Sequence, residues 1–373
     1  MSKIQQRFYY MDAMRAVLMT LGIVLHSANV FTDSPWAIQN IQTSGAFTYI
    51  VAFLHSFRMP AFFIVSGFFC HMTLKKYGYK MFLNVRIPRV IIPLVATALL
   101  LNSVQNLVLY YYYSSDIYLL SAQYWLQGKW LSHLWFLNCL VYYFLISALM
   151  YRYLPVPLEK VSHLLSNIIL KSKGIYILIL PIVSLILIKL SYLIPDLPSN
   201  LYTGSIAETI KYSGFFIFGT LIGINRSLLQ EIISIRILIL ISILFIYLAY
   251  FYAPNLNTDH SKIFMFYIES LTAWLLSFWC FYIFYKMLNT HNRFFQYLSK
   301  ASYSIYLFHH LFIIVYGIIL INTNFNIYVK FCLIVILTLI TTAAIHHFFI
   351  LKFSTLEYLF NGKKHHRQSI KSQ

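Results

Sequence analysis

The segment that decides the fold of this chain is residues 9–31, which read YYMDAMRAVLMTLGIVLHSANVF. It is apolar and long enough to cross a membrane as one helix, yet it carries Asp12, Arg15 and His26. On an α-helix the separation of Arg15 and His26 is about 20° more than three full turns, and roughly 16 Å along the axis. Asp12 lies one turn before Arg15 on the same face. Because charged side chains are costly in hydrocarbon, this polar row predicts a cavity along the helix and a functional site.

Composition places the chain among the polytopic helical membrane proteins. Of its 373 residues, 60% are hydrophobic and only 10% are charged, and the mean hydropathy is +0.70. A soluble protein of this length needs more charged residues to cover its surface. The apolar runs are long and unbroken rather than alternating, which excludes a β-barrel. We therefore expect an all-α bundle of about ten transmembrane helices that forms one integral domain over residues 1–373, with its core at about 9–351.

Apolar segments long enough to span a membrane recur along the whole chain. They lie near residues 9–31, 46–74, 87–113, 133–151, 174–194, 207–224, 235–253, 263–287, 302–321 and 327–351. The first segment carries Asp12 and Arg15 and has no small-residue cleavage site, so we expect a retained helix rather than a signal peptide.

The positive charge of the chain indicates orientation rather than nucleic-acid binding. The net charge is +18, and most Lys and Arg residues fall in short loops on one side of the ten segments. Only Lys129, Lys262 and Lys330 fall on the other side. The positive-inside rule then predicts that both termini are cytoplasmic, with residues 352–373 as a basic cytoplasmic tail. It also places Arg15 near the inner face and His26 in the outer half of the membrane.

The second apolar segment is interrupted by His55-Ser56-Phe57-Arg58-Met59-Pro60. Proline at this position predicts a break in the helix, and the polar residues before it predict a cavity wall. Arg58 is always charged and needs an anionic partner or a water-filled site. An ion pair with Asp33, Glu208 or Glu269 and a direct role in substrate binding are equally compatible with the sequence. We expect Ser66-Gly67, further along, to permit close helix packing.

A cluster of cations begins after the second apolar segment. It comprises Lys75, Lys76, Lys80, Arg86 and Arg89, and it shares the inner face with Arg15. Loop cations of this kind set topology and contact anionic lipid headgroups. Arginine also suits bidentate phosphate contacts, so the cluster, together with Arg15, is a candidate clamp for a phosphorylated cofactor.

Histidine and tryptophan residues mark further candidate positions for substrate binding. His133 and Trp135 begin the fourth segment, where Trp135 could stack on the apolar face of a sugar or simply anchor the interface. His309 and His310 point about 100° apart on a helix, so we expect only one of them to face the site. Glu269 lies in the outer half of its segment. No His, Cys or carboxylate cluster has ligand spacing, so no metal site is expected.

Four motifs in order resemble the acyltransferase-3 family of membrane acyltransferases. In chain order they are the Arg15-x10-His26 spacing, FFIVSGF at 62–68, the Arg86-x-x-Arg89 pair and SYSIYLFHH at 302–310. Three further stretches, LHSFRMPAFFIVSGFF at 54–69, LSHLWFL at 131–137 and LEYLFNGK at 356–363, narrow the likeness to family members that modify periplasmic glucans. The resemblance covers nearly the full chain.

The resemblance implies a ten-helix bundle in the bacterial inner membrane that takes an acyl group from cytoplasmic acyl-CoA. The group is delivered to a hydroxyl of a periplasmic glucan; succinyl-CoA is favoured as donor over acetyl-CoA, and no cofactor is permanently bound. The family gives His26 the catalytic role and places Arg15, Arg86 and Arg89 near the acyl-CoA. With Asp12 and Arg15 as accompanying catalytic candidates, we expect His26 to act as the base toward the glucan hydroxyl. If the donor is succinyl-CoA, Arg58 is the candidate partner of its free carboxylate.

Three other functions fit parts of the sequence. Buried Arg and His residues also suit a transporter of an anionic solute or glycan, although no internal repeat is seen. A subunit without chemistry in a glycan-synthesis complex has no need of intramembrane Arg15 and His26. The same chemistry on another envelope glycan is the strongest rival, because nothing in the sequence identifies the acceptor. A homo-oligomer is left open.

Overall fold

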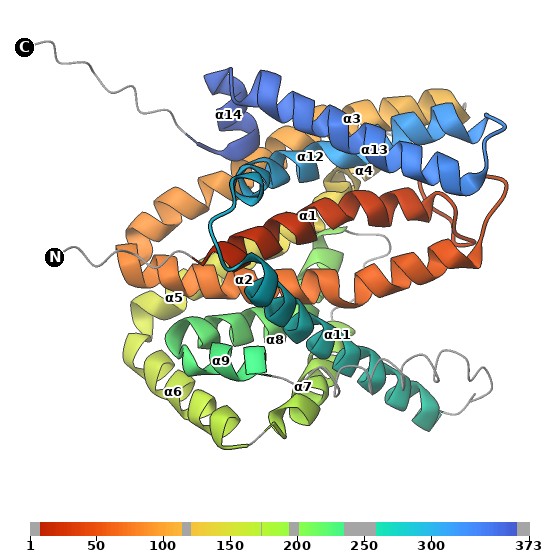
Figure 1. The fold of residues 1–373 in the computed structure, drawn as a ribbon. Helices are drawn as coiled ribbons and strands as arrows, with labels where there is room; N and C mark the ends of the chain where they lie inside the picture. The colour runs from red at the N-terminus through yellow and green to blue at the C-terminus, as the bar shows by residue number, and fades with distance from the viewer. Residues whose placement is uncertain (1–7, 114–120, 173, 194–200, 235–258, 364–373) are drawn as a thin grey trace, which may run out of the picture.

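The computed structural model describes residues 8–113, 121–172, 174–193, 201–234 and 259–363, and every regular element in these ranges is a helix (Figure 1). In chain order the elements are α1 (Tyr9–Asn29), α2 (Gly45–Arg86), α3 (Pro88–Tyr113), α4 (Ala122–Leu126), η2 (Lys129–Leu134), α5 (Trp135–Tyr153), α6 (Pro155–Lys171), α7 (Tyr176–Ser191), α8 (Leu201–Ile224), α9 (Ser227–Ser234), α11 (Asp259–Leu288), α12 (Arg293–Ile321), α13 (Ile327–Ile345), η3 (His346–Ile350) and α14 (Ser354–Asn361).

The predicted all-α architecture is confirmed within the described residues. Each predicted apolar segment in these ranges coincides with a helix, whereas the segment predicted at 235–253 lies outside them. Six helical stretches are long and apolar enough to cross a membrane, or seven if the bent pair Ser205–Ile224 and Ser227–Ser234 is one span. In that count α2 and α3 form one continuous stretch, and α7 is shorter than a full span. The number of crossings and the side of the termini stay predictions.

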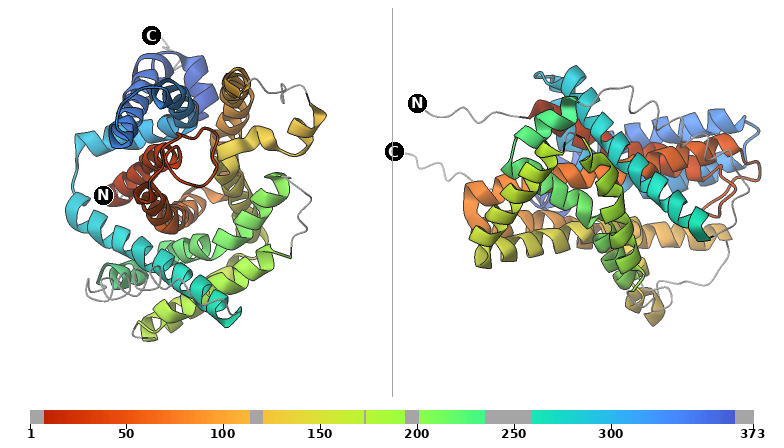
Figure 2. Two further views of the ribbon diagram at one scale, coloured as in Figure 1. Left: turned by 90° about the vertical axis from the view of Figure 1, so that its right-hand side faces the viewer. Right: turned by 90° about the horizontal axis from the view of Figure 1, so that it is seen from below.

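Helix α1 occupies the centre of the bundle. It packs against α2, α11, α12 and α13, and the end-on view in Figure 2 shows α1 and α2 enclosed by the other helices. Twelve of its residues are buried, which is more than one face of a helix provides. The polar row of α1 therefore points into protein rather than into lipid.

Helix α2 is continuous through the proline that predicted a break. Backbone angles stay helical at Pro60, and the only non-helical residue inside α2 is Gly78, with φ 70° and ψ 168°. The expected interruption at 55–60 is therefore wrong, and the chain changes direction at Gly78, where glycine tolerates a positive φ.

Helices α2 and α8 approach each other closely at two glycines. A Cβ atom on Gly67 would meet the carbonyl of Phe216, and one on Gly219 would meet the carbonyl of Ile64. The predicted role of Ser66-Gly67 in close packing is thus confirmed, because only a glycine leaves room for a backbone at this distance.

The end of the chain is more structured than the predicted tail. Helix α14 lies within residues 352–373 and packs against α3, with Glu357, Phe360 and Asn361 buried. The Ser304 hydroxyl donates to Asn361 Oδ1 at 3.1 Å, which ties α14 to α12. The predicted basic tail therefore contains a helix at residues 354–361 that packs on the bundle.

Candidate active site

A cluster of four imidazoles, one of them that of His26, lies in the middle of the bundle. The ring centroid of His26 lies 5.3 Å from that of His309 and 5.1 Å from that of His310. The ring of His133 stacks on His310 at 4.6 Å with an interplanar angle of 6°. Trp36, from the loop between α1 and α2, stacks on His26 at 5.9 Å and also contacts His310 at 5.2 Å. Candidate residues from α1, η2 and α12 are thus brought together.

Both adjacent histidines of α12 contact His26, so the expectation that only one faces the site is wrong. Because α1 packs along α12, both side chains reach the His26 ring. His309 Nδ1 lies 2.5 Å from the carbonyl oxygen of Tyr306, and His310 Nδ1 lies 2.7 Å from Oε1 of Gln105. Each Nδ1 therefore carries the proton, and each Nε2 has a free lone pair when the ring is neutral.

Arg58 lies beside this cluster, close to the backbone of α1. Its side chain comes from α2, and Nη1 lies 2.6 Å from the position that a Cβ atom on Gly22 would take. His309 Nε2 lies 3.4 Å from the same position. Gly22 is one turn before His26, so the absence of a side chain there lets the guanidinium and an imidazole approach α1.

The predicted ion pair of Arg58 does not form in the described part of the chain. Glu208 pairs with Lys211 at 3.5 Å, and Asp33 accepts a hydrogen bond from Thr43. Arg58 is only 7% exposed, and its Nε has no hydrogen-bond partner. A buried charge without a partner is unfavourable, so this position indicates an anionic ligand.

A small cavity of about 70 Å³ opens between His26 and Arg58. Its other lining residues include His55, His133 and Trp135, and none of the described lining residues is acidic. A cavity that holds a single water molecule has a volume of roughly 10–15 Å³, so this cavity has room only for a small chemical group.

A second cavity, of about 350 Å³, begins on the far side of His55. His55 lines both cavities, and Glu269, Lys211 and Tyr212 line the larger one. The Trp135 ring, which lines the small cavity, stacks on Tyr212 at 5.9 Å. Glu269 therefore lines a different cavity from the imidazole cluster, and His55 lines both cavities.

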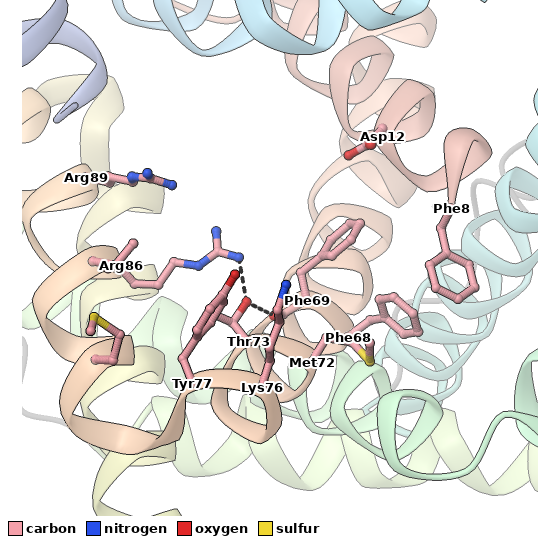
Figure 3. Close-up of a pocket in the computed structure, with 12 residues that line it drawn as sticks. Phe8, Asp12, Phe68, Phe69, Met72, Thr73, Lys76, Tyr77, Arg86 and Arg89 are labelled. Atoms are coloured by element: carbon pink, nitrogen blue, oxygen red, sulfur yellow. Dashed lines mark hydrogen bonds between the residues drawn. The ribbon is translucent and has the colours of Figure 1, made fainter. Parts of the chain in front are cut away.

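The cationic residues gather at the other end of α1, around a cavity of about 640 Å³ (Figure 3). Figure 3 shows Arg86 and Arg89 on one side of this cavity and Asp12 on the other, with Lys76 between them. Arg86 Nη2 donates to the Thr73 hydroxyl at 2.7 Å, which fixes one edge of the guanidinium. Arg86, Arg89 and Lys76 of the predicted cluster are thus brought together, whereas Lys75 and Lys80 are exposed on α2 and are not among the lining residues.

Asp12 and Arg15 belong to this cationic end rather than to the imidazole cluster. Arg15 Nη2 lies 3.5 Å from Asp12 Oδ1 and donates to the Ser299 hydroxyl at 3.2 Å. The two residues lie roughly 16 Å or more from His26 along α1, too far for proton transfer between them. Their expected catalytic role is therefore indirect in this geometry.

Three cavities form a series from the cationic end to His26. The cavity of about 640 Å³ and a neighbouring one of about 350 Å³ share Asp12, Phe69, Arg86 and Arg89 as lining residues. The latter cavity also contains Arg15, and it shares Met19, Phe62 and Phe136 with the small cavity at His26. The polar row predicted on α1 thus follows a series of adjoining spaces through the bundle.

Helix α14 and α12 hold Arg89 in this arrangement. The Tyr303 hydroxyl donates to the carbonyl of Arg89 at 3.1 Å. Gly362, which ends α14 with φ 60°, packs directly on the backbone of Pro88 and Arg89. The stretch at 356–363 therefore positions the start of α3.

Several contributors to the site escaped the sequence analysis. Trp36, Gln105 and Tyr306 all contact the imidazoles, and the Tyr306 hydroxyl donates to the carbonyl of His133 at 2.9 Å. In a chain that is 18% aromatic, single Trp and Tyr residues carry no local signal. Gln105 was detectable only as a lone amide in an apolar segment, and Gly22 only by its one-turn spacing from His26.

The chain belongs to the acyltransferase-3 family, and together with its long apolar helices this makes it a membrane acyltransferase. The sequence model of the family's acyltransferase domain matches residues 8–347. Curated relatives are glucans biosynthesis protein C of Escherichia coli K12, which is 26% identical over 372 residues, and the same protein of Escherichia coli O139:H28, which is 26% identical over 374 residues. Each match covers 96% of this chain and 95% of the relative. No solved structure matches the chain.

Proposed function

We propose that this protein is an O-acyltransferase that moves a short acyl group from cytoplasmic acyl-CoA to a hydroxyl of a periplasmic glucan. The observation that carries the proposal is the series of cavities that joins Arg86 and Arg89 to His26. Relatives named for glucan biosynthesis support the acceptor class. The same chemistry on another envelope glycan is the second candidate.

The cationic end suits the phosphates of CoA. The two larger cavities in this series are lined by Arg15, Arg86, Arg89 and Lys76. Their combined positive charge exceeds the single negative charge of Asp12. Guanidinium groups bind phosphate in a bidentate manner. A donor anchored here would extend its thioester past Met19 and Phe62 toward His26.

The small cavity limits the acyl group. A space of about 70 Å³ accommodates an acetyl or a compact succinyl group, whereas a fatty acyl chain exceeds it. We propose succinyl-CoA as the preferred donor, with acetyl-CoA as the alternative.

The reaction needs a base and stabilisation of negative charge, because the thioester is already activated. The acceptor O–H gives its proton to His26 as the oxygen forms a bond to the thioester carbon. The C–S bond then breaks, and CoA leaves as a thiol after taking that proton. The acceptor reaches His26 through the cavity that His55, Lys211 and Glu269 line.

The test is transfer of label from radioactive acyl-CoA to a glucan oligosaccharide by purified protein in nanodiscs. His26→Ala is expected to lower kcat by about 10²-fold or more, since a general base contributes about 10²–10⁴-fold. His163→Ala, an exposed histidine on α6, is the matched control and keeps wild-type turnover. Transfer by a folded His26→Ala variant at the wild-type rate would refute the assignment. Movement of label across the membrane of sealed proteoliposomes without ester formation would favour a transporter.

A further inference from the structure

The strongest unexplained feature of the site is the charge of Arg58. It is buried, its Nε has no partner, and the cavity that it lines holds no acidic residue among those described. The neighbouring rings of His26, His133 and Tyr306 are neutral or positive, so none of them compensates a guanidinium. A fixed positive charge that the protein leaves unpaired is suited to a negative charge that the substrate brings or develops.

The position of Arg58 along α1 decides where that negative charge arises. The guanidinium lies at the level of Gly22, one turn closer to the cationic end than His26. A donor that arrives from the cationic end presents its thioester carbonyl first, and the acyl tail extends beyond it. At the level of Gly22 the guanidinium would therefore meet the carbonyl oxygen, while His26 lies one turn further, where the acceptor hydroxyl attacks.

We propose, resting on the acyltransferase function above, that Arg58 is a catalytic residue that stabilises the oxyanion formed on the thioester carbonyl. The negative charge builds on that oxygen while the acceptor oxygen bonds to the carbon, and it is lost when the C–S bond breaks. Gly22 contributes to this arrangement, because any side chain there would displace the guanidinium from the backbone of α1. This role differs from recognition of a free carboxylate on the acyl tail, which the sequence suggested for Arg58.

The experiment compares Arg58→Gln and Arg58→Lys with wild type, using acetyl-CoA and succinyl-CoA as separate donors and a glucan oligosaccharide as acceptor. Loss of one oxyanion donor typically lowers kcat by about 10²–10³-fold. We expect Arg58→Gln to show a loss of this size with both donors and a nearly unchanged KM for each. Arg58→Lys keeps the positive charge but lacks the planar guanidinium with its paired N–H donors, so it should recover part of the rate.

Gly22→Ala provides a second, independent variant, since it moves the guanidinium without removing it. We expect a lower kcat with both donors, whereas Gly45→Ala, where the added Cβ meets nothing within 4 Å, should behave as wild type. Thermal unfolding of each purified variant checks that it is folded.

The outcomes separate the possible failures. A loss confined to succinyl-CoA would overturn the oxyanion role in favour of carboxylate recognition, and unchanged kcat in folded Arg58→Gln would overturn both. If wild type transfers neither acyl group, the proposed function itself fails and takes this role with it.

Discussion

At the residue scale, candidate catalytic and binding residues were predictable where their polarity differs from that of the neighbouring residues in the sequence. His26, Arg58, His309 and His310 are ionisable residues in apolar segments, which singles them out in a sequence. Trp36 could not be found this way, because its contact with His26 depends on how the loop after α1 folds back. For the same reason the ion-pair interpretation of Arg58 failed, since pairing depends on three-dimensional distance.

Arg86 provides a prediction at this scale. Its guanidinium lines both larger cavities and is oriented by the Thr73 hydroxyl at 2.7 Å. Arg86→Gln should raise the KM for acyl-CoA by about tenfold, because a charge-assisted hydrogen bond is worth about 1.5–3 kcal/mol. The KM for the glucan should stay unchanged. Steady-state kinetics with each substrate varied in turn measures both constants.

The control for this prediction is Arg152→Gln. Arg152 is exposed at the end of α5 and does not line the three cavities in series. An equal rise in KM for the two variants would mean that general positive charge, rather than the position of Arg86, attracts the donor.

At the element scale, long apolar helices were predictable and short ones were not. The segments that became α1, α3, α12 and α13 are continuous and apolar, so their length identified them. Helix α14 is short and precedes a run of basic residues, and its stability comes from packing on α3 rather than from its own sequence. The break in α2 was misplaced because Pro60 keeps helical backbone angles, whereas Gly78, with φ 70° and ψ 168°, departs from them.

A prediction about α14 follows from Gly362. Gly362→Ala should destabilise the protein by about 1–2 kcal/mol through its positive φ alone. In addition it should raise the KM for acyl-CoA, because the added Cβ would meet the backbone of Arg89. Thermal unfolding in detergent and donor kinetics measure the two effects.

Gly174→Ala is the control that separates the effect of backbone strain from the effect of a steric contact with Arg89. Gly174 has φ 94°, and an added Cβ there meets nothing within 4 Å. This variant should lose stability but keep the wild-type KM for the donor. A normal KM in Gly362→Ala as well would contradict a role of α14 in positioning Arg89.

At the scale of the whole molecule, orientation is a prediction from loop charges that the fold makes easy to test. Ile41 is fully exposed in the loop before α2, and Lys76 lies at the cationic end. In cells whose exposed Cys332 is replaced by Ser, a membrane-impermeant maleimide should label Ile41→Cys directly. It should label Lys76→Cys only after the inner membrane is opened. The reverse pattern would invert the orientation and place the donor site outside the cell.

The small volume of the cavity at His26 also bears on how the protein would bind long-chain acyl-CoA. Long-chain acyl-CoA molecules carry the same phosphates as short ones, so the wide cationic end cannot tell them apart. Their chains would halt where Met19, Phe62 and Phe136 narrow the passage, before the carbonyl reaches the imidazole. Fatty acyl-CoA would then occupy the enzyme without reacting, as a competitive inhibitor, and glucan modification would fall when lipid precursors accumulate.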